Sequence, residues 1–436
     1  RGLTAHVRRT TGEHRMGSIV VLGGAGGVGR VAVEALTTLP DSTSIVVADA
    51  RPEAVRSVID ELGDPRLAAA TVDVTNQAAL ASFLGGADVV LNCVGPFYRF
   101  GPPTLAAAIE AGVNYVDICD DLDATRALMA MDEDARSAGV TALIGMGNSP
   151  GLANIFVKMC AEQLLDELHT AEICHVHGGE TSEGAAVLKH RIHAMVDPVP
   201  LFIDGEFVEV HQLDDDGARH VREIDFAGVG PTVVHPYPHP ETITLPAAFP
   251  TLTRATNLGS VYPLAYFAMT QALVRSGMAD DRPISLPDTA GTQVQVAPID
   301  ATVALLQRER PRLLAEAGVT EPGGCLRVQV TGVVDGEPHT YVCSLNSQGA
   351  GAGEGTGIPA ALGAALMQRG ILGETPGVYP PEAIVPVDDI LNLASTVVSA
   401  LGIGRAGAGH GAAGIPLTIE HTSPDGTTEI IPMALG

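Results

Sequence analysis

A glycine-rich loop follows the first apolar run of the chain, and this feature constrains the fold more than any other. The run Ser18–Leu22 leads directly into Gly23–Gly29 (GGAGGVG), where a helical pattern begins. Gly24, Gly26 and Gly29 have the spacing G-x-G-x-x-G, which between a strand and a helix is typical of dinucleotide-binding loops. The sequence therefore predicts a site for a dinucleotide cofactor at the end of the first strand.

Each glycine of this motif has a separate predicted role. We expect Gly24 to permit the tight turn, Gly26 to let the backbone approach a pyrophosphate, and Gly29 to let helix and strand pack closely. The unpaired N–H groups at the start of the helix would donate hydrogen bonds to the phosphates. The predicted cofactor loop comprises Gly24, Ala25, Gly26, Gly27, Val28 and Gly29.

Apolar runs alternate with helical patterns over the first third of the chain. Continuous apolar strands separated by helices predict a parallel sheet that is covered on both faces, and right-handed crossovers favour the doubly wound Rossmann topology. The predicted strands are Ser18–Leu22, Ser44–Ala48, Ala68–Val72, Ala87–Val94, Asn114–Cys119 and Val140–Ile144. The predicted helices are Val28–Leu39, Pro52–Leu62, Gln77–Leu84, Pro102–Ala111 and Ala124–Ala138.

The sequence pattern changes after Pro150. A helix predicted over Leu152–Leu168 is followed by period-two alternation, and the pairs Asp204-Gly205 and Asp335-Gly336 predict tight hairpin turns. This segment is expected to form a second, α+β domain built on antiparallel strands. An Ala-rich helix over Pro359–Gly370 is expected to pack back onto the first domain.

These patterns predict four parts of the chain. Residues 1–15 are interpreted as a leader or cloning remnant upstream of Met16, and residues 16–150 with 355–403 as the dinucleotide-binding Rossmann domain. Residues 151–354 form the predicted α+β domain, and residues 404–436 a Gly-rich linker with a last hairpin around Asp425-Gly426.

Composition excludes several classes of protein. A net charge of −26 argues against nucleic acid or an anionic membrane surface as a partner. No apolar run approaches the roughly 20 residues that a membrane helix needs. The six cysteines are scattered without a C-x-x-C pair, which predicts reduced thiols in the cytoplasm rather than a disulfide framework or a cysteine-based metal site.

The residues after the second and third predicted strands bear on the choice of cofactor. Asp49 is placed to accept hydrogen bonds from the ribose hydroxyls of adenosine, which favours NAD, because a carboxylate repels a 2′-phosphate. Arg51 could instead pair with that phosphate and admit NADP, so both cofactors stay open with NAD ahead. Asp73 borders the adenine or only caps the following helix. Val94, Gly95 and Pro96 are expected beside the nicotinamide or its ribose.

Six longer motifs occur in a fixed order, and together they resemble the saccharopine dehydrogenase-like family of saccharopine reductases, lysine 6-dehydrogenases and carboxynorspermidine dehydrogenases. The resemblance covers about residues 17–403, and the lysine 6-dehydrogenase-like branch looks closest. The motifs are Asn92–Gly101, Glu110–Cys119, Gly145–Asn154, Phe202–Val210, Gly355–Ala360 and Gly377–Pro386.

This resemblance implies a Rossmann domain completed by a C-terminal helix, and a middle domain that closes over the substrate and forms a homodimer. It implies hydride transfer at a carbon–nitrogen bond of an amino acid, an opine-like conjugate or a polyamine. Two alternatives stay open: a reductase of a carbonyl or activated C=C on the same scaffold, or a protein that senses NAD(P) without turnover.

Four residues are candidates for handling the substrate and its proton. Tyr98 could hydrogen-bond or protonate the substrate nitrogen, or be only a packed aromatic. Asp121, like its neighbour Asp120, could anchor a substrate ammonium or ribose hydroxyls, or only cap a helix. Lys189 and His193 would share one face of a helix, as an acid–base pair or as an exposed basic patch.

Two pairs of histidines are candidate metal ligands. His175 and His177 point to the same face of a predicted strand, and His235 and His239 lie in a Pro-rich loop. Neither pair has an evident third ligand, so no metal site is predicted.

Overall fold

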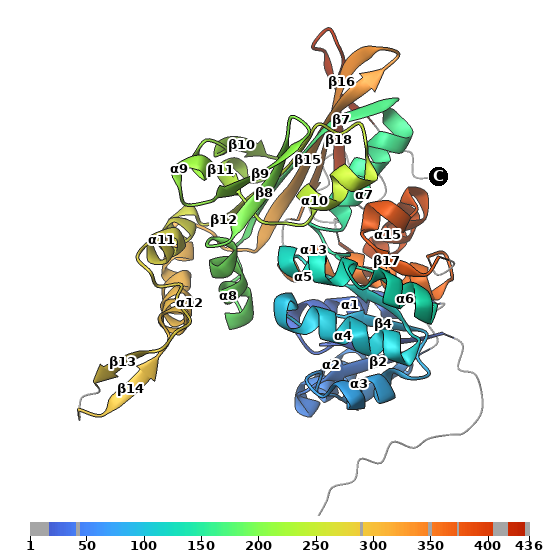
Figure 1. Ribbon diagram of the computed structural model, residues 1–436, viewed down its shortest axis with the longest axis vertical. Coiled ribbons are helices and arrows are strands. Elements are labelled where there is room, and N and C mark those ends of the chain that lie inside the picture. The colour runs from blue at the N-terminus through green and yellow to red at the C-terminus, as the bar shows by residue number, and fades with distance from the viewer. Residues whose placement is uncertain are drawn as a thin grey trace, which may run out of the picture.

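Two β-sheets organise the protein, and both are visible in the computed structural model (Figure 1). The structure describes residues 17–40, 44–287, 291–347, 351–372, 375–403 and 417–431. The predicted leader and the Gly-rich stretch 404–416 lie outside the described residues.

The first sheet has seven strands in the order β17-β6-β5-β4-β1-β2-β3, and all its neighbouring strands run parallel. Since the strand order reverses between β1 and β4, this confirms the predicted doubly wound class. The elements of this half are β1 (Ser18–Leu22), α1 (Gly27–Thr37), β2 (Ser44–Asp49), α2 (Pro52–Leu62), β3 (Leu67–Thr71), α3 (Gln77–Leu84), β4 (Val89–Asn92), α4 (Phe97–Ala111), β5 (Asn114–Asp117), α5 (Leu122–Met129), α6 (Asp132–Ala138), β6 (Thr141–Leu143) and β17 (Gly377–Tyr379).

Several helix boundaries differ from the sequence expectation, among them that of the helix predicted over Pro359–Gly370, which spans Ala352–Gln368. Helix α4 begins at Phe97 rather than Pro102, so Pro102 and Pro103 lie inside it, where each removes one backbone N–H donor. The helix predicted over Ala124–Ala138 is divided into α5 and α6. The helix predicted from Leu152 ends in a π-helical turn, so that the strand after it starts at Glu167.

The second sheet has ten strands and is antiparallel except where β12 runs parallel to β7. Its path is β10-β11-β12-β7-β15-β16-β18-β19, and β8 joins β9 to β12. The elements are α7 (Leu152–Met159), η1 (Cys160–Leu164), β7 (Glu167–Gly178), α8 (Ala185–Ala194), β8 (Pro198–Ile203), β9 (Glu206–His211), α9 (Asp215–Ala218), β10 (Arg222–Phe226), β11 (Gly230–Pro236), α10 (Glu241–Ala248), β12 (Arg254–Tyr262), α11 (Leu264–Arg275), α12 (Pro298–Glu316), β15 (Gly323–Val334), β16 (Glu337–Asn346), β18 (Leu417–Thr422) and β19 (Thr428–Ile431).

Both predicted hairpin turns adopt the conformation that their sequences favour. Asp204 and Gly205 have φ of 54° and 81°, and Asp335 and Gly336 have φ of 53° and 84°. Positive φ at both central residues is the geometry of the type I′ turn, for which Asp-Gly is a preferred pair. These turns fix the register of β8 with β9 and of β15 with β16.

The chain returns to the first sheet through α13 (Ala352–Gln368), α14 (Pro381–Ile384) and α15 (Val387–Leu401). Helix α13 packs so closely on α1 that a Cβ on Gly357 would lie 2.7 Å from the carbonyl oxygen of Val28. One buried apolar cluster includes Val21 of β1, Leu362 of α13 and Val328 of β15. The two sheets therefore share a continuous core on this side. No helix among the described residues has the length and apolar character needed to cross a membrane.

Candidate active site

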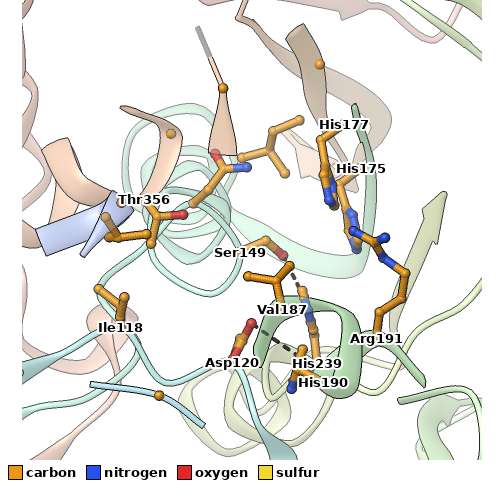
Figure 2. A pocket seen from close by; sticks show the side chains of 18 of the residues that line it. Ile118, Asp120, Ser149, His175, His177, Val187, His190, Arg191, His239 and Thr356 are labelled. Atoms are coloured by element: carbon orange, nitrogen blue, oxygen red, sulfur yellow. Dashed lines mark hydrogen bonds and ion pairs between the residues drawn. The ribbon is translucent and has the colours of Figure 1, made fainter. Parts of the chain in front are cut away.

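A cleft of about 470 Å³ opens where the strand order of the first sheet reverses, with the second sheet and α8 as its opposite wall (Figure 2). Ligands of doubly wound sheets bind at this position. From the first domain the lining residues are Gly26, Gly27, Val28, Gly29, Cys93, Gly95, Pro96, Phe97, Ile118, Asp120, Asn148 and Ser149. From the second they include His175, His177, Ala186, Val187, His190, Arg191, Tyr237 and His239, and Gly351, Gly355 and Thr356 come from the segment of α13.

The glycine loop leaves open space for a cofactor. A Cβ on Gly27 would meet no atom within 4 Å, and one on Gly26 would meet only the carbonyl oxygen of Gly23 at 3.1 Å. A Cβ on Gly29 would lie 2.1 Å from that oxygen, so the predicted close packing at Gly29 is present. The left-handed turn lies at Gly23, with φ of 73°, rather than at Gly24 as expected. Because α1 begins at Gly27, its free N–H groups border the cleft, an arrangement that fits a pyrophosphate.

The structure brings Asp49, Arg51 and Ala25 together at the ribose end of the loop. Arg51 donates from Nε to Asp49 Oδ1 at 3.0 Å and from a terminal nitrogen to the Ala25 carbonyl oxygen at 3.3 Å. Partial burial favours a higher pKa for Asp49, but the hydrogen bonds and charge of Arg51 outweigh it and lower that pKa. The predicted ribose acceptor is thus already paired with the residue expected to recognise a phosphate.

Asp73 and Val94 lie outside the cleft lining, as do Gly24, Ala25, Asp49 and Arg51 of the predicted cofactor set. The Asp73 carboxylate accepts hydrogen bonds from the backbone nitrogen and hydroxyl of Thr75, at 2.9 and 2.6 Å, and so forms a turn before α3. Asp73 is not among the residues that line the cleft, and Val94 packs against Gly23 while Gly95 and Pro96 line it.

A buried polar network holds the floor of the cleft. Asn92 donates to the Tyr115 hydroxyl at 3.0 Å, and Tyr115 donates to Asp117 Oδ2 at 2.9 Å. Asp117 Oδ1 accepts from the backbone nitrogens of Cys119 at 3.0 Å and Gly145 at 2.7 Å. Burial raises the pKa of Asp117 to about 6. The network ties the carboxyl ends of β4, β5 and β6 together, where the cleft residues begin.

The predicted catalytic residues of the first domain lie beside the cleft rather than in its lining. Tyr98 is 47% exposed, and its ring packs on His193 with centroids 5.3 Å apart. Asp121 caps α5 by accepting a hydrogen bond from the Ala124 nitrogen at 2.9 Å, which was the alternative interpretation. Their neighbours Phe97 and Asp120 line the cleft instead.

Lys189 and His193 of α8 are not among the cleft-lining residues, which agrees with the alternative of exposed basic residues rather than an acid–base pair in the cleft. Lys189 forms an ion pair with Asp300 at 2.6 Å, and His193 forms one with Asp197 at 3.0 Å. The cleft-facing residues of α8 are instead spaced by three and four positions, as helical geometry requires. They are Ala186, Val187, His190 and Arg191.

Arg191 is the principal cationic group that sequence analysis did not select. Its terminal nitrogens donate to both oxygens of Glu183, at 3.0 and 2.6 Å. Arg310 approaches the same carboxylate at 2.9 Å, and the Tyr266 hydroxyl donates to it at 2.9 Å. Burial opposes ionisation of Glu183, but the two guanidinium groups outweigh it and hold its pKa at about 2. The Arg191 guanidinium is therefore fixed in the cleft wall (Figure 2).

One ion pair joins the two walls of the cleft. His190 Nε2 on α8 lies 3.4 Å from Asp120 Oδ2 after β5, and Figure 2 marks this pair. It joins the two walls at one end of the cleft.

Aromatic side chains form the remaining wall. His175 stacks between His177 and His239, with ring centroids 6.4 and 5.1 Å away, and Tyr237 meets His175 and His239 edge-on. Burial lowers the pKa of His175 to about 3 and that of His177 to about 4, so both are neutral near pH 7. His175 and His177 do share one strand face, as predicted. The nearby hydroxyl of Ser149 lies 3.3 Å from His239 Nδ1.

Histidine and acidic side chains also gather away from the cleft. Within the described ranges, His211, Asp214 and Asp216 offer ligand atoms that lie within 4.8 Å of one another near α9, with His211 and Asp214 exposed. Without a second observation this group carries no metal assignment.

Sequence comparison agrees with this geometry. Residues 19–143 match the family model described as the saccharopine dehydrogenase NADP-binding domain. Carboxyaminopropylagmatine dehydrogenase of Synechocystis sp. is 26% identical over 373 residues, which cover 80% of this chain and 89% of that protein. Carboxynorspermidine synthase of Vibrio cholerae is 24% identical over 325 residues, or 69% and 73% of the two chains.

Two further similarities are narrower in what they show. A trans-acting enoyl reductase of Mycobacterium leprae is 26% identical over 168 residues, 37% of this chain and 39% of that one. Apo saccharopine dehydrogenase (L-Glu forming) of Saccharomyces cerevisiae superposes with a TM-score of 0.62 at 16% identity, over 93% of this chain and all of that chain. This last similarity shows a common fold. Together with the family model and the two relatives of wide coverage, it confirms the resemblance expected from the sequence motifs.

Proposed function

We propose that this chain, an NAD(P)-dependent oxidoreductase of the saccharopine dehydrogenase-like type, transfers a hydride at a carbon–nitrogen bond of an amino-acid-like or polyamine-like substrate. One observation carries the proposal: a single cleft joins the dinucleotide loop to a wall that contains a fixed guanidinium and neutral imidazoles. The named relatives with the widest coverage, a carboxyaminopropylagmatine dehydrogenase and a carboxynorspermidine synthase, support a substrate of this amine class.

Each wall would contribute a separate part of the reaction. Bound NAD(P) supplies or accepts the hydride, and the loop from Gly26 to Gly29 holds its pyrophosphate. Arg191 would bind a substrate carboxylate, because a guanidinium matches that group geometrically and Glu183 keeps it oriented. The substrate nitrogen must gain or lose a proton, and a neutral imidazole in the wall can exchange it.

We propose NADP as the better cofactor, although Asp49 alone favours NAD. Arg51 neutralises Asp49, and its side chain is 64% exposed beside the loop at Ala25. A 2′-phosphate could therefore meet a guanidinium rather than an unpaired carboxylate. The name of the matching domain model, which specifies NADP, supports the same choice.

We also propose that the protein acts as a cytoplasmic homodimer. The strands β13 (Ile284–Pro287) and β14 (Gln293–Val296) form a two-stranded ribbon that projects from α11 and α12 (Figure 1). The cross-strand pairs Ile284–Val296 and Leu286–Val294 share one face of the ribbon, and Leu286 is 45% exposed. A two-stranded ribbon of this length is only marginally stable by itself. Contact with a second copy of the chain would cover its exposed apolar face, which supports self-association. Six cysteines without a disulfide support a reducing compartment.

A second candidate reaction is reduction of a C=C bond. The similarity to trans-acting enoyl reductases supports it, but this similarity reaches 37% of the chain. It therefore supports this reaction over little more than a third of the chain.

A substrate screen separates these reactions. The purified protein would be given NAD⁺ or NADP⁺ with amino acids, opine-like conjugates and polyamines, and NADH or NADPH with mixtures of an amine and an oxo acid or aldehyde. Parallel assays would contain carbonyl compounds and activated alkenes without an amine. We expect turnover only where a carbon–nitrogen bond can be oxidised or reduced. Turnover confined to the alkenes or to carbonyl compounds without amine would refute the proposal.

A further inference from the structure

Behind the cleft wall, Ser149 connects the buried imidazole of His239, which lines the cleft, to a fully buried carboxylate. Its hydroxyl donates a hydrogen bond to Glu241 Oε1 and lies 3.3 Å from His239 Nδ1. Asn257 Nδ2 donates to both oxygens, to Ser149 Oγ at 3.1 Å and to Glu241 Oε1 at 3.2 Å. The cleft is lined by Ser149 and His239, whereas Glu241 at the start of α10 has no exposed surface.

The hydrogen-bond directions fix the tautomer of His239. While Glu241 is ionised, the single proton of the Ser149 hydroxyl is donated to it, so Ser149 Oγ can only accept from the histidine. His239 must therefore carry its proton on Nδ1, which leaves the lone pair of Nε2 free for a group in the cleft. The His175 contact at 3.1 Å to Asn257 Oδ1 keeps the Asn257 amide turned so that its nitrogen faces Ser149.

The charges around this chain of groups favour a proton on the carboxyl end. Burial raises the pKa of Glu241 to about 7, helped by the charges of Glu382 on α14 and Asp120. Lys158 on α7 donates to the Val385 carbonyl at 2.9 Å, and its charge acts on Glu382.

The imidazole end has the opposite preference. Burial lowers the pKa of His239 well below its ordinary value, and the imidazoles of His175, His190 and His177 act in the same direction. A proton that arrives at His239 is therefore more stable on Glu241.

We propose that Glu241 is the proton store of the cleft, and that it exchanges protons with the substrate nitrogen through His239 and the Ser149 hydroxyl. This inference rests on the proposed amine chemistry. In the oxidising direction, an N–H bond of the substrate ammonium breaks and its proton binds His239 Nε2. The Nδ1 proton of His239 then moves to Ser149 Oγ, while the Ser149 proton moves to Glu241 Oε1.

The step ends with neutral groups throughout. His239 holds its proton on Nε2, Ser149 is again a hydroxyl, and Glu241 is a carboxylic acid. The amine lone pair is then free to assist departure of the hydride to the bound nicotinamide. Reduction of an imine uses the same transfers in reverse. In this final state no imidazolium remains in the cleft wall, and the buried carboxylate of Glu241 has been neutralised by the proton. An unpaired imidazolium or carboxylate would be costly in a desolvated site.

Kinetic measurements on two relay variants test this assignment. Glu241→Gln keeps the shape of the side chain but cannot store a proton, and Ser149→Ala removes the connecting hydroxyl. For each we expect kcat to fall by roughly 10²-fold, the lower end of the range for general acid–base catalysis, with KM and cofactor Kd within about twofold of wild type. The rise of amine oxidation with pH through about 7 should disappear in Glu241→Gln.

Two controls separate the relay from a structural effect. Ser149→Thr retains a hydroxyl and should recover most of the rate. Ser260→Ala removes another buried serine hydroxyl, one without a hydrogen-bond partner among the described residues, and should retain the wild-type rate and pH profile. Unchanged kcat and pH profiles in both Glu241→Gln and Ser149→Ala would overturn the relay.

A measurement without turnover distinguishes failure of the relay from failure of the proposed reaction. NMR of labelled imidazole nitrogens reports the tautomer of His239 in the resting protein, with His239→Gln used to assign its signals. At a pH well above 7, where Glu241 is ionised, we expect the proton on Nδ1 in wild type and loss of that preference in Ser149→Ala. A proton on Nε2 in the wild type at that pH would overturn the relay even if amines are oxidised. The Nδ1 tautomer in a protein that reduces only alkenes would refute the amine chemistry and leave the hydrogen-bond chain standing.

Discussion

Substitutions at the glycines of the loop should differ in their effects, because a side chain added at each position would meet different surroundings. A Cβ at Gly29 would lie 2.1 Å from the Gly23 carbonyl oxygen, whereas a Cβ at Gly27 would meet no atom within 4 Å. Gly29→Ala should therefore destabilise the protein by about 2 kcal/mol or more and abolish cofactor binding, while Gly27→Ala changes stability by less than about 1 kcal/mol. Thermal unfolding with and without NADPH measures both. Equal effects of the two substitutions would contradict the loop geometry.

Substitutions of Asp49 and Arg51, beside the loop, should have opposite effects on the affinities for NAD and NADP. Asp49→Ala removes the ribose acceptor and frees the guanidinium, so NAD affinity should fall about tenfold or more, with NADP affinity retained. Arg51→Ala should weaken NADP binding by a similar factor and spare NAD. Separate titrations of the four nucleotides measure this, with Glu53→Ala on the exposed start of α2 as the control. If Asp49→Ala weakens NAD and NADP equally, Asp49 does not face the ribose.

At the scale of elements, α8 determines which side chains meet the substrate. Arg191 lines the cleft, whereas Lys189 on the same helix pairs with Asp300 outside it. Arg191→Lys keeps the charge but loses the two-point geometry, so KM for substrates with a carboxylate should rise about 30-fold, equivalent to roughly 2 kcal/mol. Decarboxylated analogues should be little affected.

The comparison substitution is Lys189→Ala. Because its ion pair is largely exposed, we expect nearly unchanged kinetics. A large loss of kcat in Lys189→Ala with none in Arg191→Lys would favour the residue selected from sequence over the one found in the cleft.

Glu183 links α8 to α12 and makes stability depend on acid pH. The folded protein holds the pKa of Glu183 near 2, below its ordinary value of 4.5. The ionised pair is therefore worth about 3 kcal/mol above pH ~4.5, and this contribution is lost as the pH falls from there toward ~2. Glu183→Gln should cost about 3–5 kcal/mol at neutral pH because it leaves two buried guanidinium groups unpaired.

Unfolding measured at several pH values tests this dependence. The stability difference between wild type and Glu183→Gln should shrink as the pH is lowered through that window. Glu316→Gln, which alters an exposed pair with Arg312, should cost no more than about 1 kcal/mol at any pH. A difference independent of pH would show that Glu183 is not ionised in the folded protein.

The contrast between α8 and the glycine loop shows what a sequence can reveal. The loop and the strand before it are local features, so Gly26, Gly29 and the parallel sheet were predictable from spacing and apolar runs. The face that α8 turns toward the cleft depends on packing against α12, far along the chain. Periodicity places Lys189 beside His193 but does not say which side is covered.

The hydrogen-bond chain from His239 through Ser149 to Glu241 could not be predicted from the sequence, for the same reason. Ser149, His239 and Asn257 come from three separate segments, and only the assembled sheet brings them within hydrogen-bond distance. One signal was present: Ser149 lies within the motif Gly145–Asn154, whose order in the chain supported the resemblance.

For the whole molecule, the position of the cleft is the main result of the fold. It lies where the first sheet reverses its strand order, and the second sheet closes it from the other side. The continuous core through α13 fixes the two sheets relative to each other on one flank, while the His190–Asp120 contact joins them across the opening. A substrate held there would meet the nicotinamide on one side and a proton-exchanging wall on the other.

The most direct test of the proposed reaction follows the hydride itself. The protein would be incubated with NADPH deuterated at the hydride-donating carbon, together with mixtures of amino acids or diamines and oxo acids or aldehydes, and the products examined by mass spectrometry and NMR. We predict one deuterium on the carbon bonded to nitrogen in a newly formed secondary amine. Deuterium in an alcohol or a saturated C–C bond, with none beside nitrogen, would contradict the account.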